Sequence, residues 1–400
     1  MRWLVLGSLI AASVYFQQAG SRPRARDLGI APGALTPGPL NAITDVDGVR
    51  VGHVTIKEGD AIRTGVTAIL PHGGNLFQQK VAGAVFVGNA FGKLAGSTQV
   101  QELGTIETPI VLTNTLSVGT AVDAVVHWTT AQPGNESVRS VNALVGETND
   151  GTLNDIRGQH VTRAHVIAAI SGARTGAVEE GAVGAGTGTI AFGWKGGIGT
   201  SSRTVRSGAN ENATDVWTVG VLVQTNYGGK LVIDGVPVWK ELTPQRGRTA
   251  AADLPPKGGS YTGSTDLSRV ASAEGDGSCM IVVATNAPLD AKNLQRLAAR
   301  AIFALARTGS TYSNGSGDFA IAFSTHPSLR VTNATGAQQR TVLPTDSVSG
   351  LFEAVLDATE EAVDNSLLKA TDVTSNGRTI SAIPIDPLKT LLRKFGRGTP

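Results

Sequence analysis

The sequence is organised around a short acidic turn that contains glycine and runs directly into an apolar segment. Residues 274–279 (EGDGSC) are small or polar, and residues 280–284 (MIVVA) are apolar and partly β-branched. A run of this length and composition is typical of a β-strand that is buried on both faces. We therefore predict that Ser278 lies where a tight turn meets a rigid strand, so that the sheet fixes its hydroxyl.

The bond before Ser278 has the local chemistry that self-cleavage requires. Gly277 has no side chain, so the Gly277–Ser278 peptide bond is open to attack by the Ser278 hydroxyl in an N→O acyl shift. Cleavage would leave Ser278 as a new N-terminus with a hydroxyl nucleophile and an α-amine, which titrates near ~8 and can act as a base. From this stretch alone, an ordinary turn before an ordinary strand is the simpler explanation.

Composition and charge exclude several classes of function. The chain has 400 residues, of which 41% are hydrophobic and 16% charged, enough to bury a large core. The net charge is +2 and no long basic block occurs, which argues against nucleic acid or an anionic membrane as a partner. Cys279 is the single cysteine and the six histidines are scattered without an HExxH pair, so we predict no metal site.

A glycine-dense segment invites comparison with a phosphate-binding loop. It spans residues 176–188, and residues 184–189 are GAGTGT. A phosphate loop carries Lys-Ser/Thr and opens a helix, whereas here no such pair follows and residues 190–194 predict a strand. We therefore predict that the protein uses no nucleotide or other cofactor.

The N-terminal segment, residues 1–20, predicts a signal peptide. Arg2 supplies the positive charge, residues 3–16 are mostly apolar, and residues 17–21 are small or polar as at a cleavage site. The apolar run is short for a membrane span, although an anchor that stays attached is the alternative. We expect a periplasmic or secreted protein with no membrane contact after the signal is removed.

Residue patterns along the chain predict an α+β layered sandwich. Asp47-Gly48 between alternating Val and Ile residues predicts a hairpin turn, and Asp290 is suited to cap a helix N-terminus. Residues 234–272 are rich in Pro, Gly and Ser and predict a linker. Strands are expected at residues 64–70, 81–87, 108–114, 141–147, 190–194, 217–226 and 319–324, and helices at 120–130, 160–170, 291–307 and 348–368. Strands and helices occur in clusters, which favours this class over a doubly wound sheet.

Five segments together resemble the β-peptidyl aminopeptidase / L-aminopeptidase–D-esterase family. They are residues 43–53 (ITDVDGVRVGH), 89–94 (NAFGKL), 102–119 (ELGTIETPIVLTNTLSVG), 154–156 (NDI) and 277–289 (GSCMIVVATNAPL). The resemblance covers about residues 40–365. It implies a four-layer αββα sandwich like that of the N-terminal-nucleophile hydrolases. It also implies self-cleavage into an α subunit (21–277) and a β subunit (278–400) that form one catalytic domain, and a homo-oligomer of such αβ heterodimers.

The resemblance also implies roles for individual residues in the chemistry. Ser278 matches the nucleophile, and Ser316 and Asp318 match the pair that orients and activates it, where the family often has Glu in place of Asp318. Asn226 matches the oxyanion-hole asparagine. Amide hydrolysis needs a nucleophile, a base and a donor to the oxyanion, and these side chains can supply all three, with either the Ser278 α-amine or Ser316 passing the proton.

Two further residues match positions that face the substrate. Glu147 matches the acid that pairs with the free amine of the substrate, and Asn149 lies where some members carry an aromatic residue. We therefore expect a self-processed serine aminopeptidase that removes β-amino-acid, D-alanyl or L-amino-acid residues from short peptides, amides or esters. The alternatives are an acyltransferase on the same architecture and a periplasmic binding protein in which the Gly277–Ser278 junction is inert.

Overall fold

The strand that begins at Ser278 lies in the middle of a sheet and is covered on both faces. The structure is a computed structural model that describes residues 22–206, 215–244 and 277–398. The strands are β1 (Arg50–Glu58), β2 (Ile62–Leu70), β3 (Val81–Ala90), β4 (Leu94–Ala95), β5 (Thr105–Ile106), β6 (Ile110–Asn114), β7 (Leu144–Thr148), β8 (Ile190–Ala191), β9 (Trp194–Lys195), β10 (Ile198–Arg206), β11 (Val216–Asn226), β12 (Ser278–Thr285), β13 (Gly317–Ser324), β14 (Val373–Ser375) and β15 (Arg378–Ile380). The helices are α1 (Ser97–Leu103), α2 (Val118–Thr130), α3 (Arg163–Ser171), α5 (Ala291–Arg307), α6 (Ser349–Leu368) and α7 (Ile385–Lys394).

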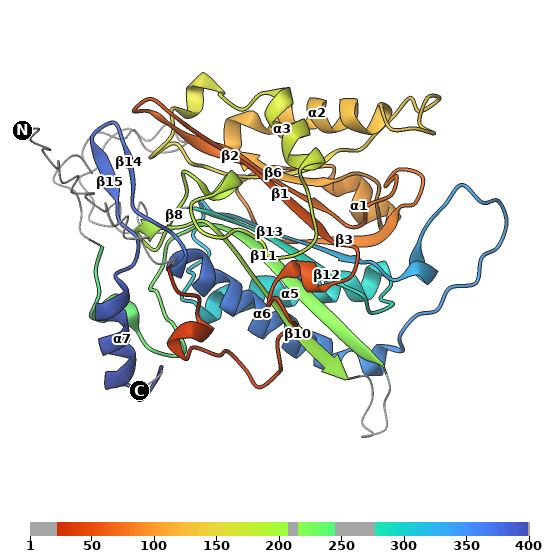
Figure 1. Cartoon of the computed structure of the whole chain (residues 1–400). Helices are drawn as coiled ribbons and strands as arrows, with labels where there is room; N and C mark the ends of the chain where they lie inside the picture. Colours follow the sequence, from red (N-terminus) through yellow and green to blue (C-terminus); the bar gives the residue numbers. More distant parts are fainter. Residues whose placement is uncertain (1–21, 207–214, 245–276, 399–400) are drawn as a thin grey trace, which may run out of the picture.

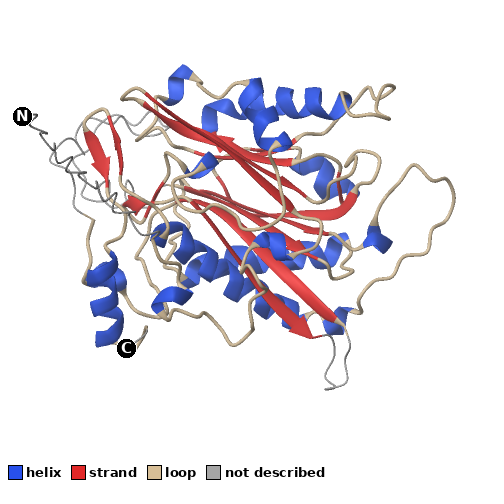
Figure 2. Ribbon diagram, in the orientation of Figure 1, coloured by secondary structure: helices blue, strands red, loops and turns tan. Residues whose placement is uncertain are grey.

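Two sheets face each other and helices cover their outer faces (Figures 1 and 2). One sheet has the order β1-β2-β6-β7-β4, and the other has the order β10-β11-β12-β13-β3-β5. Helices α2 and α3 pack on the first sheet, and α5 and α6 pack on the second. The predicted four-layer αββα sandwich is therefore confirmed.

The alternation of side chains along β12 explains why every residue in it is buried. Met280, Val282 and Ala284 join the apolar cluster between the two sheets. Cys279 and Ile281 point the other way, into the cluster between the second sheet and α5 and α6. Because successive strand residues face opposite sides, a strand between two apolar layers must be apolar throughout, as residues 280–284 are.

Most of the expected elements are present, and Asp290 is the N-cap of α5, since its Oδ1 accepts the Asn293 N–H at 2.9 Å. Two expectations are wrong in detail. Asp47-Gly48 forms a turn, with Gly48 at φ 84°, but this turn precedes β1, and the hairpin joins β1 to β2 after Glu58. Residues 190–194 form no single strand, because Phe192 and Gly193 both have positive φ (53° and 80°) and turn the chain into the small β8–β9 hairpin.

Some expectations fall partly or wholly on residues outside the described part of the chain. These are the signal peptide (1–20), most of the linker (residues 245–272 of 234–272) and residues 274–276 of the acidic turn predicted before Ser278. Among the described helices, none is both long and apolar enough to cross a membrane.

Candidate active site

Ser278 is the first residue of β12 and lies between the ends of two neighbouring strands. In the antiparallel pairing with β11 it is opposite Asn226, the last residue of that strand. In the parallel pairing with β13 it is opposite Gly317, the first residue of that strand. The pairing of three strand ends thus brings together segments that are far apart in sequence, and Ser278 is buried there at 6% exposure. Figure 1 shows β11, β12 and β13 side by side in the lower sheet.

The peptide bond before Ser278 is tightly enclosed by backbone atoms. The Gly317 N–H donates to the carbonyl oxygen of Gly277 at 3.0 Å. A Cβ atom at position 277 would lie 2.2 Å from the carbonyl oxygen of Asn226 and 2.4 Å from the Cα of Tyr227. Only glycine therefore fits before Ser278. The carbonyl oxygen of the Gly277–Ser278 bond already accepts a hydrogen bond, from the Gly317 N–H.

Ser316 and Asp318 form a buried pair that flanks Gly317. The Ser316 hydroxyl donates to Asp318 Oδ1 at 3.0 Å, so the shorter aspartate does reach its serine. Burial raises the pKa of Asp318 to about 6, although the hydrogen bonds from Ser316 and from the Cys279 backbone oppose the shift. The second oxygen, Oδ2, is buried and accepts no hydrogen bond from the residues that the structure describes. A β-bulge follows Asp318 in the pairing with β3, a feature that often occurs beside active sites.

The carboxamide of Asn226 has a defined orientation. Its Oδ1 accepts the backbone N–H of Ile190 at 3.0 Å. A backbone N–H can only donate, so the oxygen faces Ile190 and the Nδ2 amide group faces the other way. The Nδ2 donors of this buried side chain therefore lie at the end of β11, where Asn226 is paired with Ser278.

Glu147 lies near the end of β7 and is 3% exposed. Its Oε1 accepts the backbone N–H of Lys93 at 3.0 Å, and its Oε2 accepts the Thr115 hydroxyl. The Lys93 ammonium is 3.8 Å from Oε1, but that side chain is 56% exposed. The carboxylate is thus fixed by two hydrogen bonds, while its cationic neighbour stays largely in solvent.

Close packing at two glycines, Gly92 and Gly146, shows that Glu147 approaches the strand end that pairs with Ser278. A Cβ at Gly92 would lie 3.3 Å from Glu147 Oε1 and 3.4 Å from the Cα of Gly317, the strand partner of Ser278. A Cβ at Gly146 would lie 2.6 Å from the sulfur of Met280 in the facing sheet. The acid and the serine therefore approach one another from opposite sheets.

Asn149 follows β7 and is half-buried. Its side-chain oxygen accepts the Gly151 N–H at 3.0 Å, which is an Asx turn. In the described part of the chain, its hydrogen bonds do not connect it to Ser278, Asn226 or Glu147. Its role in substrate selection stays a prediction.

Sequence reasoning missed the residues that support the site. Lys93 and Thr115, which bind Glu147, lie inside two segments that carry the family resemblance, and this was the signal that could have found them. Ile190 acts through its backbone N–H, so its side chain gives no signal.

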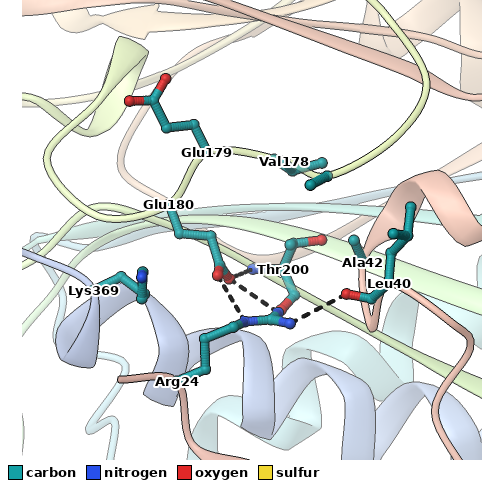
Figure 3. Close-up of a pocket in the computed structure, with 9 residues that line it drawn as sticks. Arg24, Leu40, Ala42, Val178, Glu179, Glu180, Thr200 and Lys369 are labelled. Carbon is teal, nitrogen blue, oxygen red and sulfur yellow. Dashed lines mark hydrogen bonds and ion pairs between the residues drawn. The ribbon is translucent and has the colours of Figure 1, made fainter. Parts of the chain in front are cut away.

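A pocket of about 380 Å³ lies apart from these residues (Figure 3). Arg24 enters it, pairs with Glu180 at 2.8 Å and donates to the carbonyl oxygens of Leu40 and Thr200. Its lining contains none of the candidate residues, and these polar groups already bind one another. Among the described residues, no group of three or more His, Cys, Asp or Glu side chains is placed to hold a metal ion.

Comparisons with known proteins agree with this geometry. The model of peptidase family S58 matches residues 41–380. The β-peptidyl aminopeptidase BapA of Sphingosinicella microcystinivorans is 40% identical over 411 residues, which cover 99% of each chain. The structure of a Burkholderia sp. β-aminopeptidase is 38% identical with a TM-score of 0.80, and covers 94% of this chain and 100% of that one.

A further solved structure connects the family to a fold. The L-aminopeptidase D-Ala-esterase/amidase of Ochrobactrum anthropi, described as a prototype serine aminopeptidase with a variant of the Ntn hydrolase fold, is 35% identical. Its TM-score is 0.80, with 94% of this chain and 100% of that one covered. The resemblance, the fold and the enzyme class predicted from the sequence, a serine aminopeptidase of the N-terminal-nucleophile type, are confirmed. The acyltransferase and binding-protein alternatives are not favoured. The chain belongs to peptidase family S58.

Proposed function

We propose that the protein cleaves its own chain between Gly277 and Ser278 and then uses Ser278 to release N-terminal residues from short peptides, amides or esters. The observation that carries the proposal is the meeting of Ser278, Asn226 and Gly317 at three paired strand ends. In self-cleavage, the Ser278 hydroxyl adds to the Gly277 carbonyl, the C–N bond breaks, and water hydrolyses the resulting ester. The Gly317 N–H on that carbonyl supports this step, because it stabilises the developing oxyanion.

In turnover, the Ser278 oxygen attacks the substrate carbonyl and forms an acyl-enzyme. The released proton passes to the Ser278 α-amine or through Ser316, which Asp318 orients, and then to the leaving amine. The Asn226 amide donates to the oxyanion, and water hydrolyses the acyl-enzyme. The orientation of Asn226, with its oxygen bound to Ile190, supports the donor role of its Nδ2 group.

We assign recognition of the substrate to Glu147 and Asn149. A buried carboxylate selects a terminal ammonium by charge pairing, and Glu147 is buried, hydrogen-bonded and close to the Ser278 strand end. The name of the similar β-peptidyl aminopeptidase BapA supports an N-terminal β-amino-acid residue, in preference to D-alanyl and L-α residues, as the substrate of this protein.

The substrate class is tested with a panel of p-nitroanilides that carry β-alanyl, D-alanyl and L-alanyl residues. Wild type should release p-nitroaniline fastest from the β-alanyl compound, and Ser278→Ala should release none from any compound. Activity of Ser278→Ala equal to that of wild type would remove Ser278 from the chemistry. Faster release from the L-alanyl compound would be consistent with the proposed aminopeptidase activity but would contradict the proposed β-amino-acid substrate.

We also propose that residues 1–20 direct export to the periplasm or medium and are removed, and that the αβ heterodimers assemble into a homo-oligomer. The charged and apolar N-terminal pattern supports export. N-terminal sequencing of the mature protein and light scattering after gel filtration test these two points. A retained Met1, or a mass of a single heterodimer, would contradict them.

A further inference from the structure

The β8–β9 hairpin binds the end of β11, the strand that carries Asn226. Its Ile190 N–H donates to Asn226 Oδ1 at 3.0 Å, and its Phe192 N–H donates to the carbonyl oxygen of Tyr227 at 2.8 Å. Just after the hairpin, Gly197 accepts the Thr225 N–H at 3.0 Å. The hairpin and the residues just after it thus contact three consecutive residues, the candidate oxyanion donor and its two neighbours.

Lys195 fixes this hairpin from within the protein. Its side chain is fully buried, and its Nζ donates to the carbonyl oxygens of Gly186, Thr189 and Gly196, each at 2.8 Å. An ammonium group has three N–H donors, so these three acceptors satisfy it completely. Burial lowers the pKa of Lys195 and the Lys57 charge lowers it further, whereas the Asp150 carboxylate raises it.

One peptide group connects Lys195 to Asn226. The carbonyl oxygen of Thr189 and the N–H of Ile190 belong to the same planar peptide bond, so fixing the direction of one fixes the direction of the other. Lys195 binds this carbonyl, and the N–H on its far side binds Asn226 Oδ1. Hydrogen bonds in such a chain polarise one another, so the cation also strengthens the Asn226 amide as a donor.

We propose that Lys195 is a positioning residue for the oxyanion site, acting through the Thr189–Ile190 peptide group on the carboxamide of Asn226. The inference rests on the proposed role of Asn226 in stabilising the oxyanion. It also gives the glycine-dense segment a function other than phosphate binding. Close approach requires glycine there, since a Cβ at Gly186, whose carbonyl oxygen binds Lys195, would lie 2.5 Å from the backbone nitrogen of Ile198.

The proposal is tested by a double-mutant cycle between Lys195→Met and Asn226→Ala. Rates on a free-amine p-nitroanilide are divided by the amount of the 278–400 chain released, so that slow processing does not count as lost turnover. Lys195→Met should lower kcat about 10- to 100-fold and change KM less than about threefold, because oxyanion donors act mainly in the transition state. In the Asn226→Ala background, Lys195→Met should lower kcat less than about threefold. Lys195→Gln, which keeps N–H donors, should recover part of kcat.

Arg203→Lys is the matched control, because Arg203 is also a fully buried cation but binds Glu361 on the α6 side of the molecule. It should leave kcat unchanged even where it lowers Tm. The proposal would be overturned if Lys195→Met lowered kcat equally in the wild-type and Asn226→Ala backgrounds. It would also be overturned if Arg203→Lys lowered kcat as much as Lys195→Met does. If Asn226→Ala keeps full kcat, the proposed role of Asn226 fails instead.

Amide hydrogen exchange supplies a measurement that does not depend on how Lys195 variants fold. The Ile190 amide should be protected in wild type and should exchange faster in Asn226→Ala, while the Phe192 amide stays protected. An Ile190 amide that exchanges freely in wild type would show that the link to Asn226 is absent, and would also overturn the proposal.

Discussion

Replacing Glu147 by Gln should separate recognition of the substrate amine from every other step. The amide has the same shape and can keep both present contacts. Its oxygen can accept from the Lys93 N–H, and its NH₂ can donate to the Thr115 hydroxyl, which rotates to accept. We therefore expect a folded protein, and self-cleavage at a normal rate, because the Gly277–Ser278 bond presents no free amine.

The magnitude follows from the burial of Glu147, which is 3% exposed. Breaking a buried charge pair costs ~3–5 kcal/mol, and we take the lower value because the Lys93 ammonium at 3.8 Å partly compensates the carboxylate. Since ~1.4 kcal/mol is a factor of ten, kcat/KM for free-amine substrates should fall about a hundredfold. N-acetylated substrates should be at least about a hundredfold poorer with wild type and nearly unaffected by the substitution.

The assay compares a free-amine with an N-acetyl p-nitroanilide on wild type, Glu147→Gln and Glu107→Gln. Glu107 is a matched control, because it is buried, accepts the Asn142 N–H at 2.9 Å and pairs with Lys80 at 3.4 Å, but precedes the other end of β6. The control should keep the wild-type preference for the free amine. Equal rates on the two substrates in wild type, or an unchanged preference in Glu147→Gln, would refute the role of Glu147.

Two further predictions concern groups around Ser278. Burial raises the pKa of Asp318 to about 6, so kcat/KM should fall as the pH drops through about 6, and Asp318→Asn should be slower and lack this limb. Wild type must be compared with Asp318→Asn, because burial also raises the pKa of Asp150 to about 6, and Asp150 could cause a fall in activity at the same pH. The folded pKa lies above the usual 3.8, so Asp318 stabilises the fold at low pH and loses this contribution as the pH rises through about 6. Cys279 is fully buried and burial raises the pKa of its thiol, so iodoacetamide at neutral pH should leave activity intact; rapid inactivation with alkylated Cys279 would contradict this.

The central strand was the most predictable part of the fold. Residues 280–284 are apolar on both faces because one face meets the other sheet and the opposite face meets α5 and α6. The helix after Asp290 was equally predictable, since its cap and the spacing of its apolar residues are local signals. Such features depend on residues that are close in sequence.

The arrangement of the site could not be predicted from local pattern. Asn226 and Ser278 meet through antiparallel pairing, and Ser278 and Gly317 through parallel pairing, and neither register is encoded in a short segment. The β8–β9 hairpin was missed because Phe192, a residue that rarely adopts positive φ, does so here. The site residues themselves came from the family resemblance, whereas their supports, such as the Ile190 N–H, came only from the structure.

Intact-mass measurement of the purified protein tests the central claim most directly. Self-cleavage at Gly277–Ser278 predicts a fragment of residues 278–400, which is 400 − 277 = 123 residues and about 12.6 kDa as its share of the 41.1 kDa chain. Its N-terminus should be Ser278, and it should co-purify with the larger piece because β11 and β12 are paired in one sheet. Ser278→Ala should give one uncleaved chain without activity. A fully active wild-type protein that remains a single chain would contradict the account.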